Sequence, residues 1–259
     1  MALASSETVS QQIDAPGHAG QNKGTMTEPI ISLAGVAFAW PGAQAFGIRV
    51  KQLDFAAGSK TLLVGPSGCG KSTLLSLICG IVTPQTGSIR VLDSDLTGFG
   101  SAGRDRFRAE HIGVIFQMFN LLPYGSPVDN VILPLSFAKA RRTRAEKASG
   151  DVRAEARRLL QALGIEDNLL RGSAAALSVG QQQRVAAARA LIGAPEIIIA
   201  DEPTSALDPV REDKFLSLLF EQIGEAGSTL LMVSHDERIA SRFDQVLQLE
   251  DIVQVEQAA

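Results

Sequence analysis

Short apolar runs recur along the chain and are separated by longer stretches in which apolar residues follow a helical spacing. The strand candidates lie at residues 30–40, 48–57, 61–65, 112–116, 196–200, 229–233 and 245–249. The later runs are nearly continuous in Val, Ile and Leu, which is typical of parallel strands that are buried on both faces. The pattern therefore predicts an α/β fold with a mainly parallel core sheet.

The strand pattern disappears in the middle of the chain, between residues 118 and 176. Residues in this part carry apolar side chains at the spacing of one helix face, namely Val152, Ala156, Leu159, Leu160 and Leu163. Such a period predicts helices and not strands. We interpret about residues 118–180 as a helical subdomain inserted into a domain that spans residues 29–259.

The first 28 residues are small and polar. They lack the apolar core and the basic start of a signal peptide, so they are predicted to form a disordered tail. Met26 stands just ahead of the first strand-like sequence, and we hypothesise that translation starts there. The mass of the native protein decides this.

The composition limits the classes of partner. Lysine and arginine number 24 against 28 aspartates and glutamates, which gives a net charge of −4. This balance argues against nucleic acid as the main partner, because neutralising phosphates requires a clustered basic surface. A local basic run at residues 139–158 is interpreted as a solvated helix face or connector. No window approaches the roughly 18 uninterrupted apolar residues of a membrane span, so we expect no span in this chain.

A glycine-rich loop follows the strand candidate at residues 61–65 and satisfies the pattern G-x-x-x-x-G-K-[ST]. Its residues are Gly65, Pro66, Ser67, Gly68, Cys69, Gly70, Lys71, Ser72 and Thr73. Glycines let the backbone curl around phosphates, and the N–H groups of the following helix attract anions. We predict a nucleotide site in which Lys71 reaches the β and γ phosphates and Ser72 ligates Mg²⁺. Cys69 is interpreted as filling a small-residue position, with an activated thiol as the alternative.

Polar residues follow three other strand candidates at their carboxyl ends, where ligands of open α/β folds lie. They are Gln117 after residues 112–116, Asp201 and Glu202 after residues 196–200, and Ser234 and His235 after residues 229–233. Asp201 is suited to hold Mg²⁺, Glu202 to polarise an attacking water, and Gln117 to complete the metal shell or sense the γ-phosphate. A single histidine is more often structural than catalytic, and only its place at a strand end favours a catalytic His235.

The segment LSVGQQQR at residues 177–184 contains no acid, imidazole or thiol. Ser178 and Gln181 have the spacing of a capping box, which predicts the start of a helix. A capped helix start leaves N–H groups available for an anion, and Gly180 lacks the side chain that would obstruct a phosphate. Val179 disfavours positive φ, so we predict a negative φ at this position.

Taken together, these motifs resemble the ATP-binding cassette (ABC) ATPases in their order and approximate spacing. The resemblance covers about residues 30–250. It implies a P-loop NTPase fold with a mainly parallel core sheet, an antiparallel β subdomain and an inserted helical subdomain. It also implies ATP hydrolysis with Mg²⁺, in which Lys71 holds phosphate, Glu202 is the catalytic carboxylate, His235 the switch histidine and Gln117 the lid glutamine.

The resemblance further implies that the ATP site is shared between two subunits. Ser178, Gly180 and Gln181 belong to the signature motif, which closes over ATP held by a second cassette, and Asp208 is a contact across the dimer. Trp40 matches the position of the aromatic residue that stacks on adenine, although a single tryptophan is usually part of a core.

Residues 111–138 resemble the subgroup of lipoprotein-releasing, macrolide-exporting and cell-division ATPases. This implies a homodimeric ATPase subunit that drives an integral membrane permease on a separate chain, at the cytoplasmic face of the inner or plasma membrane. Ser205 and Ala206 stand where lipoprotein-releasing members tend to have Gly-Asn, so the cargo stays open. The alternatives are an importer ATPase, a soluble ABC protein of DNA repair or translation, and a P-loop kinase.

Overall fold

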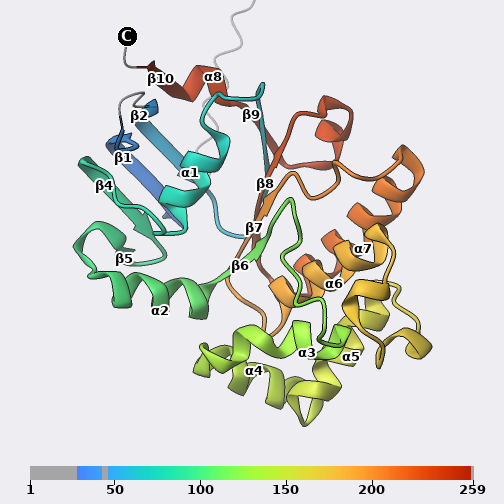
Figure 1. The fold of residues 1–259 in the computed structure, drawn as a ribbon. Helices are drawn as coiled ribbons and strands as arrows, with labels where there is room; N and C mark the ends of the chain where they lie inside the picture. Colours follow the sequence, from blue (N-terminus) through green and yellow to red (C-terminus); the bar gives the residue numbers. More distant parts are fainter. Residues whose placement is uncertain (1–27, 43–45, 258–259) are drawn as a thin grey trace, which may run out of the picture.

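The structure is a computed structural model that describes residues 28–42 and 46–257. Two β-sheets lie on either side of helix α1 (Lys71–Ile78), and a group of helices lies beyond the parallel sheet (Figure 1). The predicted tail, apart from Glu28, and the hypothesis on Met26 lie outside the described residues.

The core sheet is parallel throughout, as predicted. Its strand order is β6 (Ile112–Ile115), β7 (Ile197–Asp201), β8 (Thr229–Ser234), β3 (Lys60–Val64) and β9 (Gln245–Gln248). Each strand coincides with a predicted run to within two residues. The α/β fold class is therefore confirmed.

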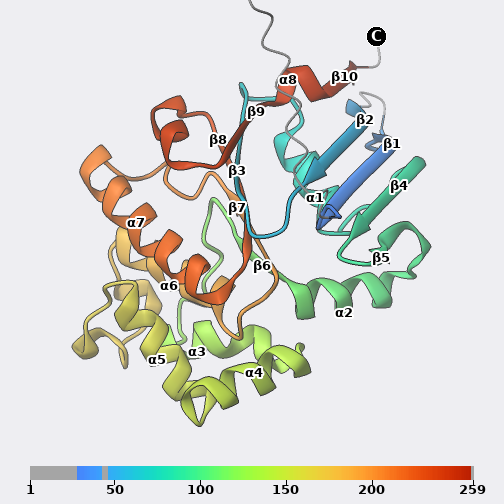
Figure 2. The same ribbon diagram turned by 180° about the vertical axis from the view of Figure 1, so that it is seen from behind.

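Alternate residues of the central strands face opposite ways, and both faces are covered. In β3, Leu62 and Val64 pack with helices α6 (Val179–Leu191) and α7 (Pro209–Ala226), while Leu63 packs on the side of α1. Figure 2 shows α6 and α7 on the face of the sheet away from α1. Burial on both faces is the physical reason that these strands read as continuous apolar runs.

The second sheet is antiparallel. Its order is β10 (Val253–Gln257), β2 (Phe46–Phe55), β1 (Ile31–Ala39), β4 (Thr86–Val91) and β5 (Ser94–Asp95). Three strands of this sheet, β4, β5 and β10, were not among the strand candidates. In β4 only Ile89 and Val91 are buried, so the apolar pattern is too short to indicate a strand.

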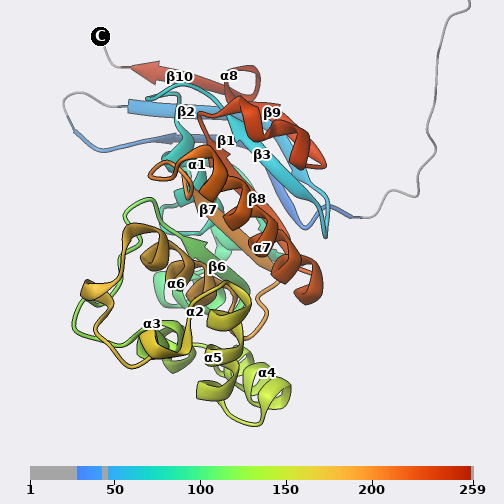
Figure 3. The same ribbon diagram turned by 90° about the vertical axis from the view of Figure 1, so that its right-hand side faces the viewer.

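Most of the remaining helices lie between β5 and β7 in the chain. They are α2 (Ser101–His111), α3 (Pro127–Ile132), α4 (Lys139–Ser149) and α5 (Val152–Ala162), with α8 (Leu249–Ile252) near the end. Short 3₁₀ helices occur at Leu96–Gly98, Leu133–Ser136, Asp167–Leu169, Ala174–Ala176 and Glu237–Arg242. Helices α3 and α5 pack against α6, and α4 packs against α5, at the end of the molecule opposite β10 (Figure 3).

Candidate functional site

The glycine-rich loop runs from the end of β3 into the first turn of α1. Gly70 precedes the helix with a φ of 97°, in the left-handed region, and a Cβ there would lie 2.8 Å from Ile48 Cγ2. Only glycine meets both conditions without strain. The loop thereby places the free N–H groups of the α1 start in front of the sheet, where they attract an anion.

Lys71 folds back over this loop. Its Nζ donates hydrogen bonds to the carbonyl oxygens of Gly65 at 2.7 Å and Pro66 at 2.9 Å, and lies 3.7 Å from Glu202 Oε1. The ammonium group of Lys71 is thus buried against the loop, and its N–H donors point toward the carbonyl oxygens of the loop. Cys69 is buried as well, and a Cβ at Gly65 would lie 2.8 Å from Cys69 Sγ, which agrees with a small residue packed inside the loop.

Ser72 and Asp201 meet at the carboxyl edge of the sheet. Ser72 Oγ donates a hydrogen bond to Asp201 Oδ2 at 3.3 Å. Burial raises the pKa of Asp201, the hydrogen bond from Ser72 opposes this, and the neighbouring charge of Glu202 raises the pKa further. Within residues 28–42 and 46–257, no three His, Cys, Asp or Glu side chains are close enough to hold a metal ion by themselves. A hydroxyl beside one carboxylate fits Mg²⁺, which typically shares one or two protein oxygens with substrate phosphates.

Glu202 lies at the centre of the polar cluster. Its carboxylate is 3.4 Å from His235 Nδ1 and accepts a long hydrogen bond of 3.5 Å from Gln117 Nε2. Its backbone has a φ of 44° and its N–H donates to Val233 O at 3.0 Å. A left-handed glutamate is uncommon, and such strain is typical of functional sites.

The structure therefore brings together the four residues predicted to be catalytic, which are Lys71, Gln117, Glu202 and His235. In the described part of the chain, Gln117 has a hydrogen bond to Glu202 and none to Ser72 and Asp201, the two other predicted metal ligands.

A cavity of about 370 Å³ opens in front of the phosphate loop. It is lined by Phe46, Ser67, Gly68, Gly70, Lys71, Ser72, Thr73 and Glu202. Trp40 borders this region: its Nε1 donates to Thr73 Oγ1 at 3.1 Å and its ring packs edge-on against Phe38 at 5.1 Å. The ring is 40% exposed, so it is not a core residue. Phe46 was missed, because an isolated aromatic at a strand start carries no sequence signal.

The signature segment starts α6 as predicted. Ser178 Oγ accepts a hydrogen bond from Gln181 N at 3.3 Å, and Gln181 Oε1 accepts one from Ser178 N at 2.8 Å, which forms the capping box. Val179 is the first helical residue and is not among the residues of positive φ, so the predicted negative φ is confirmed. Asp208 caps α7 by accepting from Arg211 N at 3.0 Å.

The signature residues do not meet the phosphate loop within one chain. Ser178, Gly180 and Gln181 line a separate cavity of about 690 Å³ together with Ala206 and Leu207. A Cβ built on Gly180 would meet only Leu207 Cδ2, at 3.7 Å. The chain itself thus leaves the approach to Gly180 open.

A phosphate loop between a parallel strand and a helix, with acidic residues at the carboxyl edge of the same sheet, defines a P-loop nucleoside triphosphatase. More narrowly, the chain belongs to the ABC transporter family, which it matches over residues 49–205. It is an ABC-type ATPase that binds ATP as a transporter subunit, which sets aside the kinase and DNA-repair interpretations.

Several named proteins are similar to this chain. The lipoprotein-releasing system ATP-binding protein LolD 2 of Rhodospirillum rubrum is 37% identical over 87% of this chain and 96% of its own. LolD of Anaeromyxobacter dehalogenans is 41% identical over 77% of this chain and 80% of its own. The macrolide export ATP-binding/permease protein MacB of Rhodopirellula baltica is 37% identical over 77% of this chain but only 28% of its own length.

Among solved structures, the chain is similar to the ATP-binding cassette MJ0796 in a dimeric post-hydrolysis state bound to ADP and Pi. The two are 31% identical with a TM-score of 0.70, over 88% of this chain and 98% of that one.

Proposed function

We propose that two copies of this chain enclose two ATP molecules and that hydrolysis drives a permease on a separate chain. The observation that carries this proposal is the position of Glu202, whose carboxylate lies within 3.7 Å of Lys71, 3.5 Å of Gln117 and 3.4 Å of His235. A carboxylate held at this point is suited to polarise a water for attack on the γ-phosphate. His235 and Gln117 then orient the carboxylate and sense the phosphate.

We assign the binding of the ATP phosphates to Lys71 and to the N–H groups at the start of α1. Bound Mg²⁺ would neutralise charge on the phosphate oxygens, and Ser72 and Asp201 are the side chains that would hold it. The raised pKa of Asp201 fits this role, because a nearby cation favours the ionised carboxylate that burial disfavours.

The second copy supplies Ser178, Gly180 and Gln181, with Asp208 reaching across. This is supported by the open approach to Gly180 and by the separate cavity that the signature residues line. MJ0796, to which the chain is similar, is dimeric with ADP and Pi bound, which supports a dimer of this chain.

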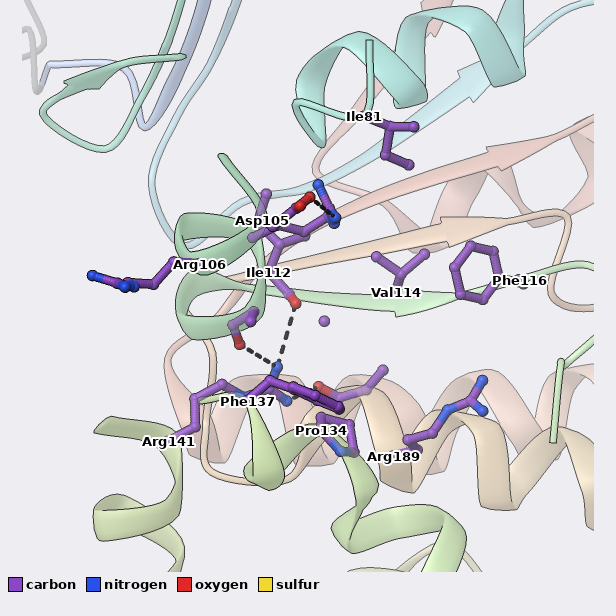
Figure 4. A pocket seen from close by; sticks show the side chains of 14 residues that line it. Ile81, Asp105, Arg106, Ile112, Val114, Phe116, Pro134, Phe137, Arg141 and Arg189 are labelled. Carbon is purple, nitrogen blue, oxygen red and sulfur yellow. Dashed lines mark hydrogen bonds and ion pairs between the residues drawn. The ribbon is translucent and has the colours of Figure 1, made fainter. Parts of the chain in front are cut away.

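A cavity of about 520 Å³ beside Gln117 is the proposed docking site of the permease. Figure 4 shows its two walls: β6 and α2 on one side, and residues 134–141 with α6 on the other. Phe137 is 73% exposed and Ile81 52% exposed at its rim. Large exposed apolar side chains in a groove are typical of a binding site, and an apolar segment of the permease fits here.

Arg141 supports the floor of this groove. The basic run at residues 139–158 was interpreted as solvated, which is wrong for this residue, because Arg141 is only 2% exposed. Its guanidinium donates to the carbonyl oxygens of Ala190, Ile192, Ala109 and Ile112. Burial lowers its pKa to about 10. The groove is therefore held in shape by a buried arginine that joins α4 to α2 and α6.

The relatives favour extraction or export over import, since they are named for lipoprotein release and macrolide export. None of the helices in the described residues is long and apolar enough to cross a membrane. We propose that the permease holds this chain at the cytoplasmic face of the membrane.

The Glu202→Gln variant tests this proposal. It keeps the size of the side chain but removes its basicity, so the turnover rate is expected to fall by about 10²–10⁴-fold while ATP still binds. The trapped ATP is expected to convert the protein to a dimer, measured by light scattering with and without ATP and Mg²⁺.

Wild-type protein without ATP serves as the control and is expected to be monomeric. A dimer that forms equally well without nucleotide, or near-normal turnover in Glu202→Gln, overturns the assigned role.

A further inference from the structure

The segment after Gln117 contains a turn with an unusual backbone. Phe119 and Asn120 have φ values of 55° and 50°, and neither is glycine. Two consecutive left-handed residues are costly for side-chain-bearing residues, so the surrounding structure must hold them in place. Within the turn, Phe119 N donates to Phe116 O at 3.0 Å and Asn120 N to Met118 O at 2.6 Å.

One side chain from another element holds both residues of this turn. Arg189 of α6 donates from Nη1 to Asn120 O at 2.7 Å and from Nη2 to Phe119 O. Its side chain is 8% exposed and burial lowers its pKa. Among the described residues it forms no ion pair with a carboxylate, so its charge-assisted hydrogen bonds all go to this turn.

Other contacts also hold the segment. The side chains of Phe119 and Leu121 pack against the core cluster that includes α6, and further hydrogen bonds lie beyond them. Asn130 accepts from Leu122 N at 2.7 Å, and Ala174 N donates to Gly125 O at 2.9 Å. These bonds anchor residues 122–125 to α3 and to the loop that precedes the signature. Among the described residues, the backbone of the strained pair, two and three residues after Gln117, is therefore hydrogen-bonded to α6 through Arg189.

We propose that Arg189 is a positioning residue that locks the strained turn to α6, so that Gln117 and the signature helix move as one body. This inference rests on the proposed function, in which Gln117 and Ser178 serve two ATP sites of the dimer. Helix α6 begins at the signature and carries Arg189 near its other end. A movement of α6 thereby displaces the segment after Gln117 through the hydrogen bonds of Arg189, and this link does not involve contact with ATP.

The same arginine lies at the docking groove. Figure 4 shows Arg189 below Phe116 and beside Pro134, among the residues that line the cavity. A permease segment in this groove would therefore press on the body that carries both Gln117 and the signature. The guanidinium is suited to this task because its planar fork donates to the two carbonyls from two separate nitrogens, whereas a lysine has a single nitrogen.

The test uses Arg189→Lys in the full chain. Amide hydrogen exchange, read by mass spectrometry, is expected to rise about tenfold in residues 117–121 while α1 and the parallel sheet keep wild-type protection. In ATP hydrolysis, kcat is expected to fall about tenfold with KM for ATP within about twofold, because Arg189 contacts no part of the phosphate loop.

Arg144→Lys is the matched control. Arg144 also holds two carbonyls, Gly193 O at 2.7 Å and Glu110 O at 3.3 Å, but it does not touch the Gln117 segment. It is expected to leave exchange at residues 117–121 unchanged. If Arg189→Lys fails to fold, Arg189→Gln removes the buried charge as well as the fork and carries the same expectation.

Unchanged exchange at residues 117–121 in a folded Arg189 variant overturns the proposal, and so does an equal rise across all of α6. A loss that appears in KM and not in kcat also contradicts it. Exchange is measured without catalysis, so absence of ATPase activity in the wild type counts against the proposed function and leaves the link between Arg189 and the turn to be judged separately.

Discussion

Two aromatic residues lie at the edge of the cavity in front of the phosphate loop, and we propose that they contact the base of ATP. Trp40 and Phe46 are joined through the backbone, since Trp40 N donates to Phe46 O at 2.9 Å. The indole is tied to Thr73 of the phosphate loop by a 3.1 Å hydrogen bond. Trp40 is the single tryptophan of the chain, so its fluorescence reports on this edge alone.

This signal measures the effect of Lys71→Ala on ATP binding. The substitution removes a charge-assisted hydrogen bond to phosphate, typically worth about 1.5–3 kcal/mol, so Kd is expected to rise by about ten- to a hundredfold. ATP titrated into the wild type is expected to change Trp40 emission at a lower concentration than in the variant. Identical titration curves for the two proteins contradict the role of Lys71.

At the residue scale, the sequence predicts those groups whose role follows from one local motif. Glu202 and His235 each follow a buried strand directly, and Lys71 follows the glycine-rich loop after β3, so the edge of the sheet and the loop determine where they lie. Phe46 and Arg189 are different, because their neighbours come from distant parts of the chain. Arg189 is 70 positions from Phe119, and no spacing within the sequence indicates that contact.

At the scale of the element, α6 starts with the signature segment, and the surroundings of its first two residues, Val179 and Gly180, differ. Val179 takes the first helical position with ordinary backbone geometry and is 52% exposed. Gly180 lines a cavity, and the nearest atom to a Cβ built there is Leu207 Cδ2 at 3.7 Å, an ordinary van der Waals contact. A side chain at position 180 therefore fits within the monomer and would conflict only with something that approaches from outside.

Gly180→Val is expected to fold normally, with a change in the free energy of unfolding below about 0.5 kcal/mol, because valine is no worse than glycine in a helix. In the Glu202→Gln background it is expected to bind ATP but not to form the ATP-dependent dimer. Val179→Gly is the control and is expected to retain that dimer. Thermal unfolding and light scattering measure the two effects, and a normal dimer with valine at position 180 refutes the assignment.

The elements themselves differ in how far the sequence reveals them. The central parallel strands β7 and β8 are predictable because each is buried on both faces and is apolar at almost every position. Helix α2 is not, since only Phe107 is buried among its eleven residues. Strand β10 pairs with β2 through backbone hydrogen bonds that no side-chain pattern encodes.

At the scale of the whole molecule, the residues assigned to ATP and the proposed docking groove lie at different places on the parallel sheet. Its carboxyl edge carries the residues assigned to ATP, and β6 runs from the docking groove to Gln117 at that edge. Arg141 and Arg189 link the groove to α6, whose first turn is assigned to the partner copy's ATP. We propose that permease docking and ATP enclosure are joined through helix α6, while they use surfaces that do not overlap.

Phe137→Asp tests this separation. The ring is 73% exposed at the groove, so an aspartate there leaves the core intact but places a charge where an apolar partner segment is expected. Copurification with the permease is expected to be lost, whereas the ATP affinity of the isolated subunit and the ATP-dependent dimer in Glu202→Gln stay unchanged. Val246→Asp is the control, because Val246 is 39% exposed on β9, at the edge of the parallel sheet opposite β6. Retained copurification with Phe137→Asp places the permease elsewhere, and loss of ATP binding contradicts the independence of the two surfaces.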